Sequence, residues 1–219
     1  METVAIILAG GKGERFGSLK QFLSIHNIPV FIHTLNKFDG FQKVLVISEQ
    51  SYKITTKILK QYKIPDIELC FGGETRQESV FKGLQHCLGF TFGLKNVIIT
   101  DANRPCITQR TLVGCLEALK ENKSVATVCK SINTTCFSYD GEILGDIYDR
   151  TYSYELLMPQ AFDFETIYKA HRDTTKENAS DDTQLLSEDI FTQLIQIPFW
   201  EGLKLTYPED VKIFETLLK

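Results

Sequence analysis

The chain has 219 residues, of which 43% are hydrophobic and 24% charged, so its composition is that of a globular protein and excludes disordered and fibrous classes. Its 24 Lys and Arg against 28 Asp and Glu give a net charge of −4, which argues against a broad nucleic-acid surface. No apolar run approaches the length of a membrane span, and the acidic N-terminus does not resemble a signal peptide. We therefore expect one cytoplasmic domain over residues 1–219, with no nucleic-acid or membrane partner.

Short apolar runs alternate with longer amphipathic stretches along the first 130 residues. The runs predict strands at residues 4–8, 43–48, 68–71, 96–100 and 124–129. The amphipathic stretches predict helices at residues 29–38, 52–62, 75–87 and 108–121. This alternation predicts a three-layer, Rossmann-like α/β fold, with a mostly parallel twisted sheet and helices on both faces.

The pattern changes between residues 131 and 154, where the chain is polar and β-prone, with a turn at Tyr139-Asp140-Gly141. This segment predicts a protruding hairpin or β-arm. Further along, we expect helices at residues 163–172 and 181–189, a strand-like segment at 203–206, and a helix opened by Pro208.

A glycine loop follows the first strand, at the edge of the sheet where such folds bind ligands. Its glycines are Gly10, Gly11 and Gly13. Glycines let backbone N–H groups cradle phosphate oxygens, and Lys12, Arg15 and Lys20 add positive charge. The spacing matches neither the dinucleotide fingerprint nor the P-loop, and a triphosphate would use three cations better than a pyrophosphate diester would. A plain glycine turn with solvated lysines is the alternative.

The stretch LAGGKGERFG…LKQF resembles the opening of the cytidylyltransferases that make CDP-activated polyols. The two most similar groups act on 2-C-methyl-D-erythritol 4-phosphate and on D-ribitol 5-phosphate. Further matching segments follow in order: GGETRQESV at 72–80, TDANRP at 100–105, Asp149-Arg150, PQAF at 159–162, SDD at 180–182 and LKLTYPED at 203–210. Several motifs in the same order are much stronger evidence for this resemblance than any single motif would be.

The resemblance implies CTP-dependent transfer of CMP to a small polyol phosphate, with release of pyrophosphate and with Mg²⁺ as cofactor. It also implies a homodimer, in which the β-arm carries an arginine to the partner's acceptor site. The implied catalytic residues are Arg15, Lys20 and Lys204. The implied nucleotide-binding residues are Ala9, Gly10, Gly11, Gly13, Gly73, Glu74 and Ser79. The implied substrate-binding residues are Asp101, Thr134 and Arg150, with Asp101 also binding the metal.

Simple physical arguments accompany these assignments. Both reactants are anionic, so the site must supply cations that stabilise the transition state. Asp101 follows a strand, where a carboxylate could bind magnesium or only form a turn. Arg104 could be a ligand or a structural salt-bridge residue. Ser79 could contact the base or face solvent. The arm could pair with a second subunit or be a mobile surface hairpin.

Several positions depart from the family pattern, mostly where the polyol would bind. Asn133 stands where an acid is usual, Met158 replaces a threonine, and Gly202-Leu203 lacks the usual asparagine and isoleucine. The segment between Arg15 and Lys20 is also short. These changes favour the hypothesis that the acceptor is neither of the two usual polyol phosphates, although the LAGG opening and residues 31–35 look slightly nearer the ribitol-type group.

Two other functions stay open from the residues alone. The glycine loop and Glu49 would suit an NAD(P)-dependent oxidoreductase, and a non-catalytic nucleotide-binding module would use the same fold. The four histidines lie at no spacing that suggests catalysis. The six cysteines form no CxxC pair, which predicts free, mostly buried thiols and no zinc site.

Overall fold

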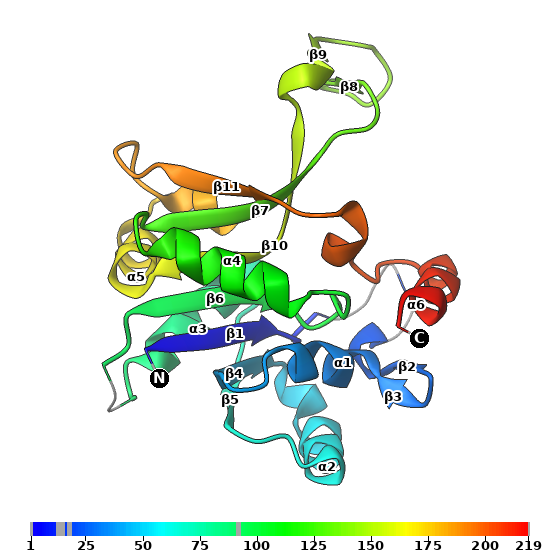
Figure 1. Cartoon of the computed structure of the whole chain (residues 1–219), viewed down its shortest axis with the longest axis vertical. Helices are drawn as coiled ribbons and strands as arrows, with labels where there is room; N and C mark the ends of the chain where they lie inside the picture. The colour runs from blue at the N-terminus through cyan, green and yellow to red at the C-terminus, as the bar shows by residue number, and fades with distance from the viewer. Residues whose placement is uncertain (1, 12–15, 17–18, 91–92, 219) are drawn as a thin grey trace.

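The computed structural model describes residues 2–11, 16, 19–90 and 93–218. A seven-stranded sheet in the order β11-β7-β10-β6-β1-β4-β5 forms its centre (Figure 1). The strands are β1 (Thr3–Leu8), β4 (Gln42–Ile47), β5 (Ile67–Phe71), β6 (Asn96–Asp101), β7 (Ser124–Lys130), β10 (Tyr154–Asp163) and β11 (Thr192–Gln196). Strand β10 runs antiparallel to its neighbours β6 and β7, and the other pairs are parallel. The predicted α/β fold with a mostly parallel sheet is confirmed.

Helices cover both faces of the sheet because successive strand residues point to opposite sides. Ala5 and Ile7 of β1 join one apolar core, with α1 (Val30–Lys37), α2 (Tyr52–Tyr62) and α4 (Gln109–Leu119). Val4 and Ile6 join the other core, with α3 (Arg76–Cys87) and α5 (Phe164–Asp173). The C-terminal helix α6 (Val211–Leu217) packs beside the small hairpin of β2 (Ser24–Ile25) and β3 (Ile28–Pro29).

Threonine caps determine where two of the predicted helices begin. The Thr75 hydroxyl accepts from the N–H of Glu78 at the start of α3, and Thr108 accepts from Thr111 at the start of α4. Such caps satisfy N–H groups that have no partner within the helix. Both helices therefore begin one residue after the predicted position.

The segment 131–154 forms an arm that projects from the sheet (Figure 1). It contains β8 (Thr135–Cys136) paired antiparallel with β9 (Ile147–Tyr148), followed by the 3₁₀ turn η3 (Arg150–Tyr152). The arm leaves the end of β7 and returns as the first residues of β10. The predicted hairpin is therefore confirmed as a structural element.

Two sequence predictions were wrong near the C-terminus. Residues 181–189 form only the short 3₁₀ turn η4 (Asp182–Leu185), because the Asp181 carboxylate binds the Thr183 N–H at 2.9 Å and turns the chain. Residues 203–206 form no strand. They run extended between the 3₁₀ turns η5 (Phe199–Gly202) and η6 (Pro208–Asp210), and their backbone binds Asn103 and the Asp210 side chain instead of a strand.

The prediction for the cysteines holds, since all six are free and four are buried. Among the residues that the structure describes, no helix combines the length and apolarity that crossing a membrane requires.

Candidate active site

The carboxyl ends of β1, β4, β5 and β6 meet at one edge of the sheet, where a cavity of about 800 Å³ opens. The chain leaves β1 for β4 on one side and later returns to β6 on the other, so the cavity lies at the topological switch point. Nine of the predicted site residues line it: Ala9, Gly10, Gly11, Lys20, Gly73, Glu74, Ser79, Asp101 and Lys204. The predictions for Gly13 and Arg15 lie outside the described residues.

A buried glutamine orders the described part of the glycine loop. Gln21 donates from Nε2 to the Ala9 carbonyl oxygen at 2.9 Å and to that of Gly11 at 3.4 Å. Ala9 in turn donates its N–H to the Val46 carbonyl oxygen at 2.7 Å. These bonds hold the loop at the end of β1. Sequence reasoning missed Gln21, although its place beside Lys20 was a usable signal.

A second turn, between β5 and α3, is held by its own side chains. The Gly73 N–H donates to Ser79 Oγ at 3.1 Å, and the Glu74 N–H donates to Glu78 Oε2 at 2.8 Å. A Cβ at Gly73 would lie 2.3 Å from Glu78 Cβ, so only glycine fits there. Ser79 therefore faces the turn and the cavity, which answers the alternative that it faces solvent.

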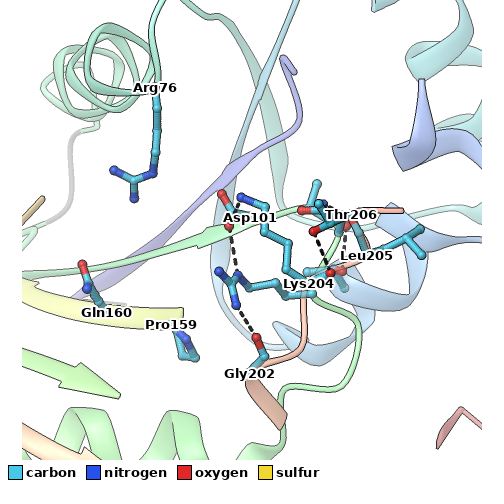
Figure 2. A network of polar contacts seen from close by, with 12 residues as sticks. Arg76, Asp101, Pro159, Gln160, Gly202, Lys204, Leu205 and Thr206 are labelled. Carbon is cyan, nitrogen blue, oxygen red and sulfur yellow. Dashed lines mark hydrogen bonds and ion pairs between the residues drawn. The ribbon is translucent and has the colours of Figure 1, made fainter. Parts of the chain in front are cut away.

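The Asp101 carboxylate, at the end of β6, joins two cations from different parts of the chain (Figure 2). Arg104 Nε lies 2.9 Å from Oδ2, and Lys204 Nζ lies 3.0 Å from the same oxygen. Burial alone would raise the pKa of Asp101, but Lys204 and Arg104 hold it well below its usual range. Arg104 also donates from Nη1 to the Gly202 carbonyl oxygen, so it is a salt-bridge residue in this structure.

Residues 3–219 match the family model described as IspD: 2-C-methyl-D-erythritol 4-phosphate cytidylyltransferase. The chain belongs to the IspD family. A ribitol-5-phosphate cytidylyltransferase of Vibrio parahaemolyticus serotype O3:K6 (strain RIMD 2210633) is 31% identical to this chain. The alignment of 226 positions covers 98% of this chain and 95% of the relative.

Solved structures of IspD proteins share the fold. The 4-diphosphocytidyl-2C-methyl-D-erythritol synthase of Anaerococcus prevotii DSM 20548 gives a TM-score of 0.84 at 26% identity, covering 99% of this chain and 97% of that one. The 2-C-methyl-D-erythritol 4-phosphate cytidylyltransferase of Thermus thermophilus gives 0.78 at 24% identity, covering 99% and 98%. This IspD-family chain is thus a CTP-dependent cytidylyltransferase of the polyol phosphate type, which replaces the oxidoreductase and the non-catalytic alternatives.

Nucleotidyltransferases of this kind typically use a divalent metal, and the Asp101 carboxylate is an oxygen ligand of the type that magnesium prefers. Arg104 and Lys204 both contact Oδ2 of this carboxylate. One carboxylate together with substrate phosphates and water is a common magnesium site. Within the described residues there is no cluster of three or more His, Cys, Asp or Glu side chains that would hold a metal without substrate.

A buried ionic cluster that the sequence did not reveal lies beside the cavity. Arg76 Nη2 lies 2.6 Å from Asp182 Oδ2, and His171 Nε2 lies 3.1 Å from Oδ1 of the same carboxylate. Burial would raise the pKa of Asp182, but the hydrogen bond from His171 and the charge of Arg76 lower it. The contact links α3, α5 and η4, and its Arg76 side chain belongs to a residue that lines the cavity. His171 therefore does have a carboxylate partner.

The two remaining predicted residues lie on the arm, away from the cavity of their own chain. Thr134 and Arg150 are exposed, and neither lines the cavity. Arg150 donates from Nη1 to the Ile132 carbonyl oxygen at 3.3 Å. In a single chain, Thr134 and Arg150 therefore lie apart from the nine predicted residues that line the cavity.

Proposed function

We propose that this enzyme transfers CMP from CTP to a polyol phosphate of the D-ribitol 5-phosphate type. The observation that carries the proposal is the convergence of Lys20, Lys204 and Asp101 on one cavity with the Gly73 turn. These groups come from four separate parts of the chain. Grouping cations around one carboxylate at a strand end suits a polyanionic nucleotide.

The reaction requires an in-line displacement at the α-phosphorus. An oxygen of the acceptor phosphate forms the new bond to phosphorus, the bond from phosphorus to the oxygen bridging to the β-phosphate breaks, and its electron pair leaves with pyrophosphate. A phosphate monoester dianion is already a nucleophile, so no general base is needed. The protein must align two anions and offset their repulsion.

Lys204 and Lys20 are assigned to the α-phosphate, where negative charge concentrates during the displacement. The contact with Asp101 directs the Lys204 ammonium toward the end of β6. Arg15 is assigned the same task by its position in the family motif. Asp101 would hold Mg²⁺, which would supply charge neutralisation for the triphosphate.

The nucleotide base is assigned to the turn at Gly73. Ala9, Gly10, Gly11 and Gly13 are assigned to the phosphates and ribose, and Gly73, Glu74 and Ser79 to cytosine. Backbone N–H and C=O groups of a rigid turn can distinguish the amino and carbonyl edge of cytosine. The Ser79–Gly73 hydrogen bonds supply that rigidity.

The arm is assigned to the acceptor of a second copy of the chain, so that Thr134 and Arg150 complete the partner's site in a homodimer. Its exposed apolar side chains support this arrangement, because a monomer rarely leaves so many in water. They include Ile132, Tyr139, Ile143, Leu144, Ile147 and Tyr152. Pairing the arm in a closed twofold would cover them.

The ribitol type is favoured by one relative, and the arm's sequence indicates an altered acceptor site. The curated relative that is 31% identical over nearly the whole chain is named for ribitol 5-phosphate, whereas the 4-diphosphocytidyl-2C-methyl-D-erythritol synthase of Anaerococcus prevotii is 26% identical. Asn133 also offers a neutral amide where an acid is usual, which alters the hydrogen bonding available to a polyol.

The test is pyrophosphate release with CTP and Mg²⁺ over a panel of acceptors. D-Ribitol 5-phosphate should give the highest kcat/KM, above 2-C-methyl-D-erythritol 4-phosphate and other pentitol phosphates, and ATP or GTP should replace CTP poorly. A higher kcat/KM with 2-C-methyl-D-erythritol 4-phosphate would overturn the ribitol assignment.

A further inference from the structure

The extended segment 203–206 carries Lys204 to the cavity without belonging to the sheet, so other contacts must hold it there. Asn103, two residues after Asp101, binds this segment both as a hydrogen-bond donor and as an acceptor. Its side-chain Nδ2 donates to the Leu205 carbonyl oxygen at 2.6 Å, and its own carbonyl oxygen accepts from the Leu205 N–H at 3.0 Å. Asn103 is only 5% exposed and Leu205 is fully buried.

We propose that Asn103 is a positioning residue that acts through Lys204. Lys204 lies between two residues that are each bound to the loop after β6 (Figure 2). On one side the Gly202 carbonyl oxygen accepts from Arg104, and on the other side Leu205 is paired with Asn103. The backbone of Lys204 is therefore held at both ends against the loop that carries Asp101.

The upstream end of the segment has a separate anchor. Glu201 is buried, and its Oε2 accepts from the hydroxyls of Thr108 at 2.8 Å and Thr111 at 2.5 Å, at the start of α4. Because this anchor does not depend on Asn103, loss of the amide should loosen residues 204–206 without releasing the whole segment. The defect should then fall mainly on the Lys204 ammonium.

A held backbone matters because the Lys204 side chain is partly exposed, at 35%, and has four rotatable bonds. An ammonium that stabilises a transition state must be in place before the charge develops, since reorganisation during the reaction lowers the benefit. The paired hydrogen bonds of Asn103 limit where Lys204 Cα can lie. The inference rests on the proposed role of Lys204 at the α-phosphate.

The test is a double-mutant cycle between Asn103 and Lys204, measured by pyrophosphate release with CTP, Mg²⁺ and whichever acceptor of the panel turns over. Asn103→Ala should lower kcat about 10-fold and change KM for CTP less than about 2-fold, because the Gly73 turn is untouched. In a Lys204→Ala background the same change should lower kcat less than about 2-fold, since the residue through which it acts is gone.

Two further variants keep the test interpretable. Asn103→Leu preserves the side-chain volume but cannot donate, so it should reproduce the kcat loss even if the alanine variant folds poorly. Asn122→Ala removes a similar amide, which donates to the Ala118 carbonyl oxygen at 2.8 Å at the far end of α4, and should leave kcat unchanged. Thermal unfolding confirms that each variant is folded at the assay temperature.

The outcomes separate this inference from the proposed function. An equal loss of kcat in the wild-type and Lys204→Ala backgrounds would overturn the inference. A raised KM for CTP or the acceptor would also overturn it, because it would indicate that Asn103 contacts the substrate directly. Wild-type kcat in both Asn103 variants would also overturn it. Wild-type kcat in Lys204→Ala alone would instead overturn the assigned role of Lys204.

Discussion

At the scale of single residues, the site depends on charges that are buried with their partners. Asp101 and Asp182 lie at 10% and 1% side-chain exposure, and each contacts two cationic or ionisable side chains. Removing one member of such a group leaves the others uncompensated in a poorly solvated place. Substitutions here should therefore be far more damaging than those at surface ion pairs.

Lys204→Ala is expected to lower kcat by about 10²–10³, because one oriented cation at a transition state is typically worth that factor. Steady-state pyrophosphate release measures it. Lys95→Ala is the matched control, since Lys95 forms an exposed ion pair with Glu2 at 2.8 Å on the surface. A Lys95→Ala enzyme as slow as Lys204→Ala would show that the loss comes from general damage.

Asp182→Asn should lower the free energy of unfolding by about 3 kcal/mol at pH 7, since Arg76 would lose its buried partner. The folded pKa of Asp182 is lowered, so its stabilisation is present above the carboxyl's ordinary pKa of about 4 and is lost as the pH falls through the folded value. Urea unfolding between pH 7 and pH 3 should show a shallower acid dependence in the variant. An identical slope in both proteins would contradict the pairing.

Thiol reactivity should follow burial. Burial raises the pKa of Cys87 and Cys115 to about 12 and that of Cys106 to about 11, whereas Cys136 is exposed on the arm. Because the thiolate is the reactive form, a disulfide reagent at pH 8 should label Cys136 first in the native protein. Cys136→Ser should remove the fast phase, and a fast phase that persists would place a second reactive thiol elsewhere.

At the scale of elements, two glycines in helices show how closely each helix approaches the sheet. A Cβ at Gly83 in α3 would lie 2.9 Å from Ile6 Cγ2 and 3.1 Å from Val46 Cγ2 of the strands beneath. A Cβ at Gly114 in α4 would meet nothing nearer than Ile195 Cδ1 at 4.0 Å. The close approach of α3 thus depends on a residue without a side chain, and that of α4 does not.

Alanine substitutions at Gly83 and Gly114 should therefore change the free energy of unfolding in opposite directions. Gly83→Ala is expected to destabilise by about 1–3 kcal/mol through overpacking. Gly114→Ala is expected to stabilise by about 0.5–1 kcal/mol, because alanine is the better helix former and restricts the unfolded chain. Chemical denaturation of both variants measures the two changes, and a stabilised Gly83→Ala would contradict the packing of α3.

Sequence periodicity predicted the elements whose residues alternate clearly between core and surface. It missed β10, which begins in the arm, is exposed over residues 154–156 and contains Pro159, a residue that argues against a central strand. It missed β11 because that edge strand is short and largely exposed. Both strands form through pairing with distant β7, which no local pattern encodes.

At the scale of the whole molecule, the arm separates two groups of predicted site residues. Asp101 and Lys204 were predictable because each belongs to a motif, and the cavity unites them. The contacts that bring them together were not predictable, since Asn103 and Leu205 are separated by about a hundred residues of chain. Thr134 and Arg150 lie apart from the cavity, so their assigned role requires a second subunit.

Subunit mixing tests that requirement. Lys204→Ala and Arg150→Ala should each be nearly inactive alone. Exchange between the two should restore about a quarter of wild-type activity, because hybrid dimers would contain one intact site. The recovery is measured as steady-state kcat before and after subunit exchange, and sedimentation shows that the protein is a dimer. Two inactive variants that stay inactive after verified exchange would confine each site to one chain.

The pairing of Lys204 with Asp101 has a consequence for turnover. A site built only from mutually repelling cations would hold the α-phosphate of the CDP-polyol product tightly, and departure of that product would limit the cycle. Here the ammonium has a carboxylate of the same protein 3.0 Å away. As that product departs, this internal counter-ion takes the place of its α-phosphate, so the Lys204 ammonium is neutralised again without recruiting an ion from solution.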